Sequence, residues 1–358
     1  MTEQNTLHLY VNYPHREDSY SSISEALASL PSFSPLPQSY PAADEPKIMP
    51  VILHIAPGVY EEQLVIDRPY LTFMGEDAEN TVLTYHLGAN EMLADGSKRG
   101  TFRTASVRIN THDFTAKNIT FRNNAGYGHT VGQALALYAD GDRLVFENCR
   151  LLSSQDTLFT APLPPTAAKP GGFTGPGEHK PRILGRHYYK NCFIQGDVDF
   201  IFGSGIAFFD ECTIYSKMPG DRKPPESPDE EVIYGYITAA STPQDIPYGY
   251  VFKDCSLESD CPPATIYLGR PWREWAKTVF IHCQLGAHIH PLGWNDWNKP
   301  HGHFYYGEFD SYGPGACPQK RAAFSHQLTE EEAALYTIEN VLAGPDNWNP
   351  LYEAGKQQ

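Results

Sequence analysis

The sequence has no apolar run that approaches the roughly 18 residues of a membrane-spanning helix, so no such helix is predicted. Its first residues, Met1 followed by Thr-Glu-Gln-Asn, contain neither the basic nor the apolar segment of a secretory signal. These two absences favour a cytoplasmic protein. A secreted mature form is the alternative.

Cysteine patterns typical of metal sites and of dense disulfide frameworks are also missing. The chain has seven Cys residues, an odd number, and no CxxC or mixed Cys/His spacing. Neither a disulfide scaffold nor a metal-binding module is therefore expected.

Basic residues are few relative to acidic ones. The chain has 27 Lys and Arg against 43 Asp and Glu, which gives a formal net charge of −16 at pH 7. Because this charge repels polyanions, we expect neither nucleic acid nor an anionic membrane as a partner.

Glycine, proline and aromatic residues are abundant instead. The 358 residues include 29 Gly, 30 Pro, 22 Tyr and 18 Phe. This composition favours many short strands and turns over a helical bundle. The length suits either one large solenoid or two conventional domains.

One pattern recurs along most of the chain. Each copy is an aromatic strand, a polar turn residue and then a small or apolar residue that begins another strand. The copies lie at 114–121, 144–151, 187–194, 207–214, 250–257 and 278–285. We therefore predict an all-β solenoid of stacked parallel coils that forms one domain, residues 1–358.

Five of the seven Cys residues occupy the same position in this repeat. Their spacings are 43, 20, 43 and 28 residues, which, taken as one or two coils each, give roughly 20 to 28 residues per coil. We interpret these Cys as small hydrophobic residues stacked in an internal ladder, with redox or metal chemistry as the alternative. The ladder consists of Cys149, Cys192, Cys212, Cys255 and Cys283.

A parallel β-coil needs caps at its open ends, and the chain offers a short helix near each terminus. We predict one helix over 18–30, capped by Asp18 or Ser21, after a first strand at Leu7–Val11. A second helix is predicted over 329–342, where Thr329 and Glu332 form a capping box. Further strands are predicted at 51–55, 64–66 and 71–74.

Four loops interrupt the repeat. They span 87–100, 161–182, 218–231 and 286–303. Insertions in a repeat protein commonly gather on one face, which is often the binding face.

Two Asp residues lie in apolar and aromatic surroundings on either side of the 161–182 insertion. Asp156 follows Gln155 directly, and Asp199 is followed by Phe-Ile-Phe-Gly. A carboxylate in apolar surroundings is unfavourable unless it is paired, so two of them suggest one ionised and one protonated group. The alternative is that each Asp is a turn residue. Because the insertion takes up about half of the 43 residues between them, the two Asp could lie on adjacent coils.

Three further residues complete a set suited to acyl transfer. Gln133, together with Gln155, can donate N–H groups to a developing oxyanion, and Arg270 can hold one Asp ionised. Trp272 offers a flat face of the kind that sugar rings bind. The alternatives are packing between coils for the Gln and Trp side chains, and a structural ion pair for Arg270.

The sequence resembles the pectin methylesterases (pectinesterases) from about residue 7 to about residue 351. The motifs that carry the resemblance occur in the family's order. They are Gly58-Val-Tyr-Glu-Glu62, Gln133-Ala-Leu-Ala-Leu137, Gln155-Asp-Thr-Leu158, the 196–203 stretch Gly-Asp-Val-Asp-Phe-Ile-Phe-Gly, Ile237-Thr-Ala-Ala240, Leu268-Gly-Arg-Pro-Trp272, Gly293-Trp-Asn295 and Tyr312-Gly-Pro-Gly-Ala316. The resemblance implies a right-handed parallel β-helix and hydrolysis of the methyl esters of galacturonan.

The resemblance also implies a role for each candidate residue. Asp199 resembles the nucleophile, and Asp156 the acid that protonates methanol and then activates water. Gln133 and Gln155 resemble the oxyanion donors, and Arg270 the partner of Asp199. The remaining three, Trp272, Phe200 and Tyr138, are expected to contact the substrate. This mechanism requires no metal ion and no organic cofactor.

Some features depart from the plant-type enzymes. The 161–182 insertion separates the two Asp stretches further, and the 218–231 loop adds to a compact segment. The absent signal and the acidic charge point to a bacterial-type enzyme that acts on methylated oligogalacturonides, with pectin itself as the other expected substrate. We also expect a monomer.

The same scaffold can carry other functions. A pectate lyase would use a Ca²⁺ cluster of several carboxylates, and a galacturonan hydrolase would leave the two Gln without a role. A thioesterase, another ester hydrolase and a catalytically silent carbohydrate-binding β-helix are the remaining alternatives.

Overall fold

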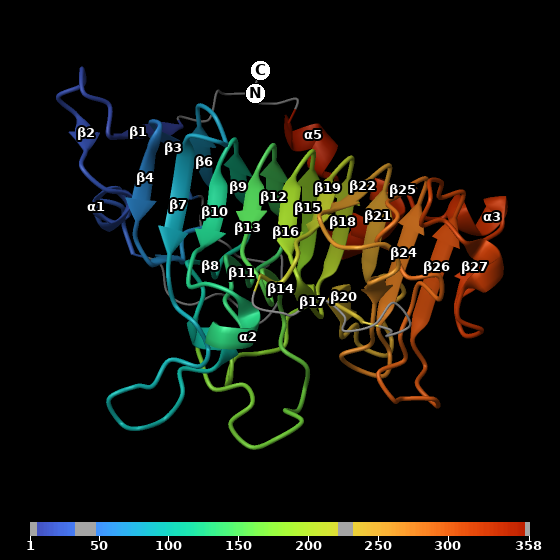
Figure 1. Ribbon diagram of the computed structural model, residues 1–358. Helices are drawn as coiled ribbons and strands as arrows, with labels where there is room; N and C mark the ends of the chain where they lie inside the picture. Colours follow the sequence, from blue (N-terminus) through green and yellow to red (C-terminus); the bar gives the residue numbers. More distant parts are fainter. Residues whose placement is uncertain (1–5, 33–47, 221–231, 355–358) are drawn as a thin grey trace.

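The computed structural model describes residues 6–32, 48–220 and 232–354. These residues wind into a stack of coils that runs from the N-terminal to the C-terminal end of the chain (Figure 1). All strand pairs are parallel, and successive coils contribute strands to three long sheets. The predicted parallel β-helix is therefore confirmed.

The first sheet has twelve strands and runs the full length of the stack. Its strands, in spatial order, are β2 (Ser19–Tyr20), β1 (Leu7–Val11), β3 (Val51–Ile55), β6 (Leu71–Gly75), β9 (Phe114–Lys117), β12 (Leu144–Glu147), β15 (Arg186–Lys190), β18 (Ile206–Asp210), β21 (Tyr250–Lys253), β24 (Lys277–Ile281), β26 (Tyr305–Phe309) and β27 (His326–Gln327).

The second and third sheets have eight and seven strands. The eight-stranded sheet contains β25 (Gln284–Leu285), β22 (Ser256–Ser259), β19 (Thr213–Ser216), β16 (Phe193–Gly196), β13 (Arg150–Leu152), β10 (Thr120–Asn123), β7 (Thr81–Tyr85) and β4 (Gly58–Glu61). The seven-stranded sheet contains β23 (Ile266–Gly269), β20 (Gly235–Ala240), β17 (Val198–Gly203), β14 (Leu158–Thr160), β11 (Leu137–Ala139), β8 (Val107–Ile109) and β5 (Leu64–Ile66).

The strand register corrects the sequence-based coil length. Leu144 pairs with His187, and Ala207 pairs with Tyr250. A spacing of 43 residues is therefore one coil with an inserted loop, and the interpretation of such a spacing as two coils was wrong. The inserted loops made the number of residues per coil difficult to recognise in the sequence.

The interior of the β-helix consists of side chains stacked from coil to coil. Phe209 lies between Tyr189 and Phe252, with ring centroids 4.8 and 4.4 Å away and the planes within 11° of parallel. The five Cys of the repeat are buried and unpaired, and the Cys192 N–H points at the sulfur of Cys212. The predicted Cys ladder is confirmed.

A second ladder lies at the turns between the first two sheets. Asn148 accepts a side-chain hydrogen bond from Asn191 at 2.7 Å and donates one to Asn118 at 3.2 Å. All three Asn have a positive φ, between 51 and 56°, a conformation that Asn adopts more readily than most residues. This explains the polar residue at the turn of each repeat.

The N-terminal helix is shorter than predicted. Helix α1 spans Ile23–Ala28, and its N-cap is Ser22, which accepts a hydrogen bond from Glu25. Neither Asp18 nor Ser21 caps it. The chain just before it is extended, because β2 pairs with β1, and the Asp18 carboxylate is bound by Arg16. The helix lies beside β1 at the first end of the stack (Figure 1).

The single C-terminal helix predicted over 329–342 is two helices. These are α3 (Glu330–Ala333), which begins with the predicted capping box, and α4 (Ile338–Leu342). The α3 helix lies at the last end of the stack, next to β27 (Figure 1). In contrast, α4 packs on the outer face of the twelve-stranded sheet, where Leu342 joins a cluster with Tyr188 and Phe208. The remaining short helices are α2 (Gly128–Val131), α5 (Pro350–Ala354), η1 (Thr101–Arg103), η2 (Pro318–Lys320) and η3 (Gly344–Asp346).

A buried ion-pair network fastens this C-terminal segment to the coils. The Arg186 guanidinium donates to both carboxylate oxygens of Asp142, at 2.9 and 2.6 Å, and to Asp346 at 3.0 Å. We expect Arg186→Met to lower the free energy of unfolding by about 3 kcal/mol, because the carboxylates of Asp142 and Asp346 lose Arg186 and keep only their contacts with Arg143. Urea unfolding measures this change.

The matched control for this prediction is Lys190→Met. Lys190 pairs with Asp210 and Glu211 nearer the surface, so its loss should change the free energy of unfolding by about 1 kcal/mol or less. Equal effects of the two substitutions would show that the Arg186 network does not fasten the C-terminal segment.

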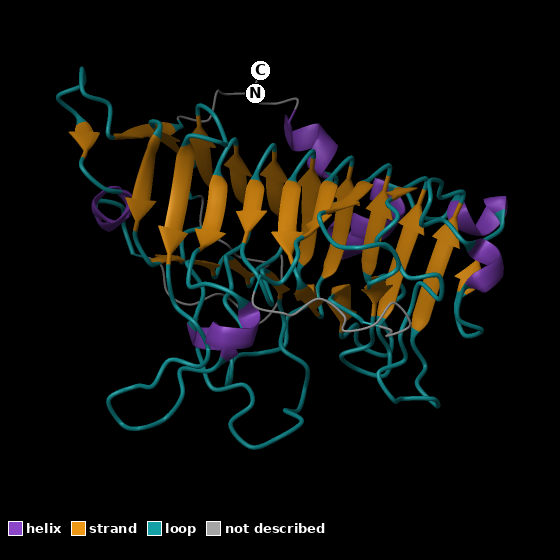
Figure 2. Cartoon of the chain, viewed as in Figure 1, coloured by secondary structure: helices purple, strands orange, loops and turns teal. Residues whose placement is uncertain are grey.

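Three of the four predicted insertions project from the same side of the stack. The 87–100, 161–182 and 286–303 loops extend below the sheets in Figure 1, the first two of them near α2. The 218–231 loop lies outside the described residues beyond Gly220. Figure 2 shows how few and short the helices are beside the strands. None of the helices in the described ranges has the length and hydropathy needed to span a membrane.

Candidate active site

The two candidate Asp residues occupy equivalent positions on adjacent coils. Leu158 pairs with Ile201, so Asp156 and Asp199 each precede a paired residue by two positions. The N–H of Asp156 donates to the carbonyl of Val198 at 3.0 Å. Because β14 and β17 are neighbours, the insertion between them leaves the two carboxyl groups on one surface.

Arg270 reaches Asp199 from two coils away. Its Nε donates to Oδ1 of Asp199 at 2.8 Å and its Nη2 to Oδ2 at 2.7 Å. Such a bidentate pair is stronger than a single neutral hydrogen bond and fixes the plane of the carboxylate. The pairing predicted from the sequence is therefore present in the geometry.

The two carboxyl groups are equally buried, but their charged neighbours favour different protonation states. Each Asp residue is only 7% exposed. Burial and the nearby charge of Asp199 raise the pKa of Asp156 well above its usual value. Burial also raises the pKa of Asp199, but the Arg270 guanidinium opposes that rise. The arrangement favours an ionised Asp199 beside a protonated Asp156.

The two Gln residues lie on adjacent coils beside this pair. The N–H of Ala134, next to Gln133, donates to the carbonyl of Gln155 at 3.1 Å. Gln155 directly precedes Asp156 and packs against Gly128 of α2, where an added Cβ would approach its side chain to 2.7 Å. Both Gln residues are half-buried, and the side chain of Gln155 is hydrogen-bonded with the carboxyl group of Asp156.

Phe200 does not line this surface, which corrects the sequence-based expectation. Its side chain is 0% exposed and belongs to the core inside the coils. The register between β17 and β20 shifts between Val198 and Ile201, so Phe200 and Ile201 both point inward. The next aromatic residue, Phe202, is the one that points outward, into a separate cluster.

This outer cluster contains the other two predicted substrate-contacting residues. Tyr138 is only 1% exposed and lies beneath the 161–182 insertion, where Gly177 approaches its hydroxyl group. The burial of Tyr138 leaves little of it to contact a substrate. Trp272 is half-buried, with its ring 5.6 Å from Phe202 and 6.1 Å from Phe173 of the insertion. The insertion therefore forms a wall beside Trp272.

Three residues near Arg270 were not identified from the sequence. Tyr236 and Trp297 each place a ring centroid 3.8 Å from the Arg270 guanidinium carbon. Lys299 donates to the carbonyl of Pro271 at 2.8 Å. Trp297 and Lys299 lie in the 286–303 loop, so the interruption of the repeat indicated the region but not the residues.

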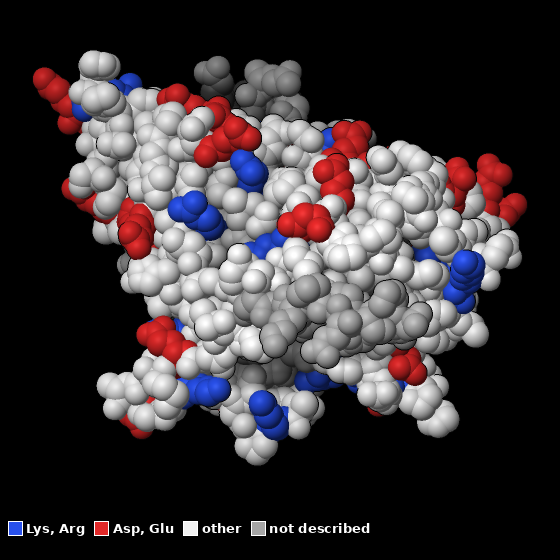
Figure 3. Space-filling view, viewed as in Figure 1, with Lys and Arg blue, Asp and Glu red and all other residues white. Residues whose placement is uncertain are grey.

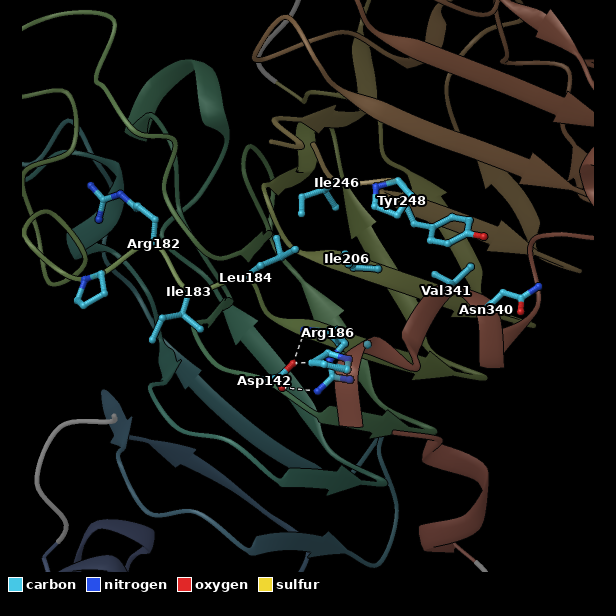
Figure 4. A pocket seen from close by; sticks show the side chains of 14 residues that line it. Asp142, Arg182, Ile183, Leu184, Arg186, Ile206, Ile246, Tyr248, Asn340 and Val341 are labelled. Atoms are coloured by element: carbon cyan, nitrogen blue, oxygen red, sulfur yellow. Dashed lines mark hydrogen bonds and ion pairs between the residues drawn. The ribbon is translucent and has the colours of Figure 1, made fainter. Parts of the chain in front are cut away.

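A large cavity elsewhere in the molecule is separate from this site. It has a volume of about 640 Å³ and lies between α4, β18 and the end of the 161–182 insertion (Figure 4). Of the described residues that line it, which include Ile206, Tyr248 and Val341, none belongs to the Asp–Gln–Arg set. In the described parts of the chain, no three His, Cys, Asp or Glu side chains are grouped so that they could hold a metal ion.

The comparison with known protein families decides between the remaining functions. The family model described as "Pectinesterase" matches residues 19–163 and 183–345. The chain belongs to the pectinesterase family. The match omits residues 164–182, so most of the Pro- and Gly-rich insertion is an addition to the family's common structure.

Curated relatives of this pectinesterase include proteins from plants. It is 33% identical to the Arabidopsis thaliana protein named pectinesterase QRT1 over 83% of this chain and 70% of that protein. It is 31% identical to pectinesterase 31 of the same plant over 84% of each chain.

Solved structures agree in fold over nearly the whole chain. The pectin methylesterase PemA from Erwinia chrysanthemi is 28% identical with a TM-score of 0.74, over 98% of this chain and 99% of that one. A pectin methylesterase in complex with a hexasaccharide has a TM-score of 0.75 and 28% identity, over 97% and 98% of the two chains. This pectinesterase is thus a carboxylic ester hydrolase that removes methyl esters from pectin and releases methanol.

Proposed function

We propose that Asp199 is the nucleophile of this esterase. One of its carboxylate oxygens attacks the carbonyl carbon of the methyl ester, and the resulting tetrahedral intermediate expels the methoxy group. The products of this half-reaction are methanol and an acyl-enzyme, in which the substrate carbonyl is bonded to Asp199. The bidentate contact with Arg270 supports this role, because it keeps Asp199 ionised in a buried position.

Asp156 then acts first as an acid and afterwards as a base. As an acid it gives its proton to the departing methoxy oxygen. As a carboxylate it takes a proton from the water that attacks the acyl carbon, and the bond to Asp199 breaks. Asp156 ends the cycle protonated and Asp199 ionised, which are the states that their surroundings favour.

Gln133 and Gln155 are the proposed donors to the negatively charged oxygen of the tetrahedral intermediates. Their half-buried positions on adjacent coils, with Gln155 directly before Asp156, support this assignment. Trp272 is the proposed contact for the sugar ring. No step requires a metal ion or an organic cofactor.

The substrate that we propose is methylated galacturonan, including its oligosaccharides. Support comes from the similar pectin methylesterase whose structure contains a hexasaccharide. The 161–182 wall beside Trp272 favours short chains, because Arg273 binds the carbonyl of Thr166 and fixes the insertion at the site.

The finer assignments are also proposals. A bacterial-type enzyme is supported by the near-complete structural match with the Erwinia chrysanthemi protein, whereas the curated relatives are from plants. One catalytic domain over residues 1–358 is supported by sheets that run from β1 to β27. We also propose a monomer without a membrane partner. On the face shown in Figure 3, basic residues are scattered among acidic and neutral ones.

The observation that carries the proposal is the bidentate contact of Arg270 with Asp199, on the coil next to the buried Asp156, and a pH profile tests it. Activity should rise as pH rises through the pKa of Asp199, and fall as pH rises through the higher pKa of Asp156. The rate of methanol release should therefore follow a bell-shaped curve. A rate that is constant from acid to neutral pH would contradict this division of roles.

A further inference from the structure

The Arg270 guanidinium lies against two aromatic rings. Its central carbon is 3.8 Å from the ring centroid of Tyr236 and 3.8 Å from that of Trp297. A guanidinium stacked on aromatic rings is held in orientation as well as attracted, because both groups are planar. The same guanidinium donates both hydrogen bonds to Asp199.

The strand order explains why Arg270 needs such support. Arg270 follows β23, whereas Asp199 lies on β17, and β20 separates these two strands. The Arg270 side chain must therefore cross β20 before it reaches the carboxylate. Tyr236 is the β20 residue on which it rests, and Tyr236 itself stacks on Tyr267 with the planes 8° from parallel.

Trp297 comes from outside the coils, on the 286–303 loop. The N–H of Asn295 donates to the carbonyl of Gly269, which directly precedes Arg270, at 3.1 Å. The side chain of Asn295 in turn accepts from the N–H of Trp297 at 2.8 Å. Lys299 places its ammonium 4.5 Å from the Trp297 ring and binds the carbonyl of Pro271. These contacts fasten the loop on both sides of Arg270.

The backbone at Trp297 adopts a conformation that is unfavourable for its residue type. Its φ is 52°, and that of Asn298 is 55°. Asn tolerates this left-handed region, but a bulky aromatic residue seldom enters it. Strain of this kind, held in place by surrounding contacts, tends to occur where a side chain must point in a particular direction.

We propose that Trp297 is a positioning residue, which holds the Arg270 guanidinium in the plane that lets both of its N–H groups bind Asp199. The proposal rests on the roles proposed above for Asp199 and Arg270. Trp297 shields the ion pair from water, and Tyr236 supports the guanidinium from the β20 side. Without Trp297, the Arg270 guanidinium loses one of its two ring contacts, and Asp199 is held less firmly in the orientation that nucleophilic attack requires.

The test compares steady-state kinetics of Trp297→Ala and Trp297→Phe on a methylated oligogalacturonide. We expect Trp297→Ala to lower kcat by about 10- to 100-fold with less than about a threefold change in KM. Trp297→Phe keeps a flat ring and should recover most of the loss. A change confined to KM would overturn the proposal, because it would make Trp297 a substrate platform.

Trp275→Ala is the matched control. Trp275 is also half-buried and lies beside the 286–303 loop. Its ring stacks on His303 and not on Arg270. Its substitution should leave kcat within about twofold of the wild type, because the Arg270–Asp199 geometry is untouched. An equal loss of kcat in Trp275→Ala and Trp297→Ala would overturn the proposal.

A double-mutant cycle with Arg270→Lys shows whether Trp297 acts through Arg270. Lys cannot make the planar bidentate contact, so Trp297→Ala should lower kcat much less in that background than in the wild type. Losses that simply multiply would overturn the proposal. If Asp199→Ala and Arg270→Lys both keep full activity, the proposed function has failed. If both lose activity while Trp297→Ala does not, only the positioning role has failed.

Discussion

Asp199→Ala is expected to lower kcat for methanol release by at least about 10⁴-fold. The reason is chemical, because the variant has no carboxylate to form the acyl-enzyme while Arg270 and both Gln residues remain. The KM of the residual activity should change little, since Asp199 contributes a reacting atom more than binding energy. Methanol quantified over long incubations measures the loss.

Asp254→Ala is the appropriate control for this variant. Asp199 and Asp254 both have a left-handed backbone, with φ of 50 and 54°, so an Ala at either position meets the same backbone strain. Asp254 is exposed at a turn between sheets and should retain wild-type kcat. A comparable loss in both variants would attribute the effect to the fold and contradict the nucleophile assignment.

Asp156→Asn is expected to lower kcat by about 10²- to 10⁴-fold, because Asn can neither protonate methanol nor accept a proton from water. The pH profile should also change shape. In the wild type, activity falls as pH rises through the pKa of Asp156, which burial and the charge of Asp199 raise. In the variant that alkaline limb should be lost, while the acid limb set by Asp199 remains.

An Asp156→Asn variant that keeps both limbs of the profile would contradict this role for Asp156, since another group would then be the acid. Asn has nearly the same volume as Asp and should preserve the packing at this buried site, and near-ultraviolet circular dichroism checks that it does.

The fold was predictable because each coil of the β-helix has a recognisable sequence pattern. The aromatic strand, the polar turn residue and the Cys recur at the same position, and each became a stacked row inside the β-helix or at its turns. The coil length was harder to predict, because inserted loops changed the spacing between Cys residues from 20 to 43. Only the strand register separates an insertion from a second coil.

The grouping of Asp156, Asp199 and Arg270 was also predictable, since these residues are unusual in apolar surroundings and occur in family motifs. The direction of neighbouring side chains was not. Phe200 directly follows Asp199 and was therefore expected to contact the substrate, but the register shift after Val198 turns its side chain into the core. Trp297 reaches Arg270 through a loop whose path depends on contacts with Gly269 and Pro271. Contacts of this kind, between segments that are distant in the chain, cannot be predicted from a local sequence pattern.

The most direct test of the function is a stoichiometric analysis of the products formed from highly methylated pectin and from short methylated oligogalacturonides. The proposed function predicts one free carboxylate for each methanol released, with chain length unchanged and no unsaturated chain ends. The ratio of the rates on the two substrates reports whether the 161–182 wall favours short chains. Shortened or unsaturated chains, or a folded protein that releases no methanol from either substrate, would contradict it.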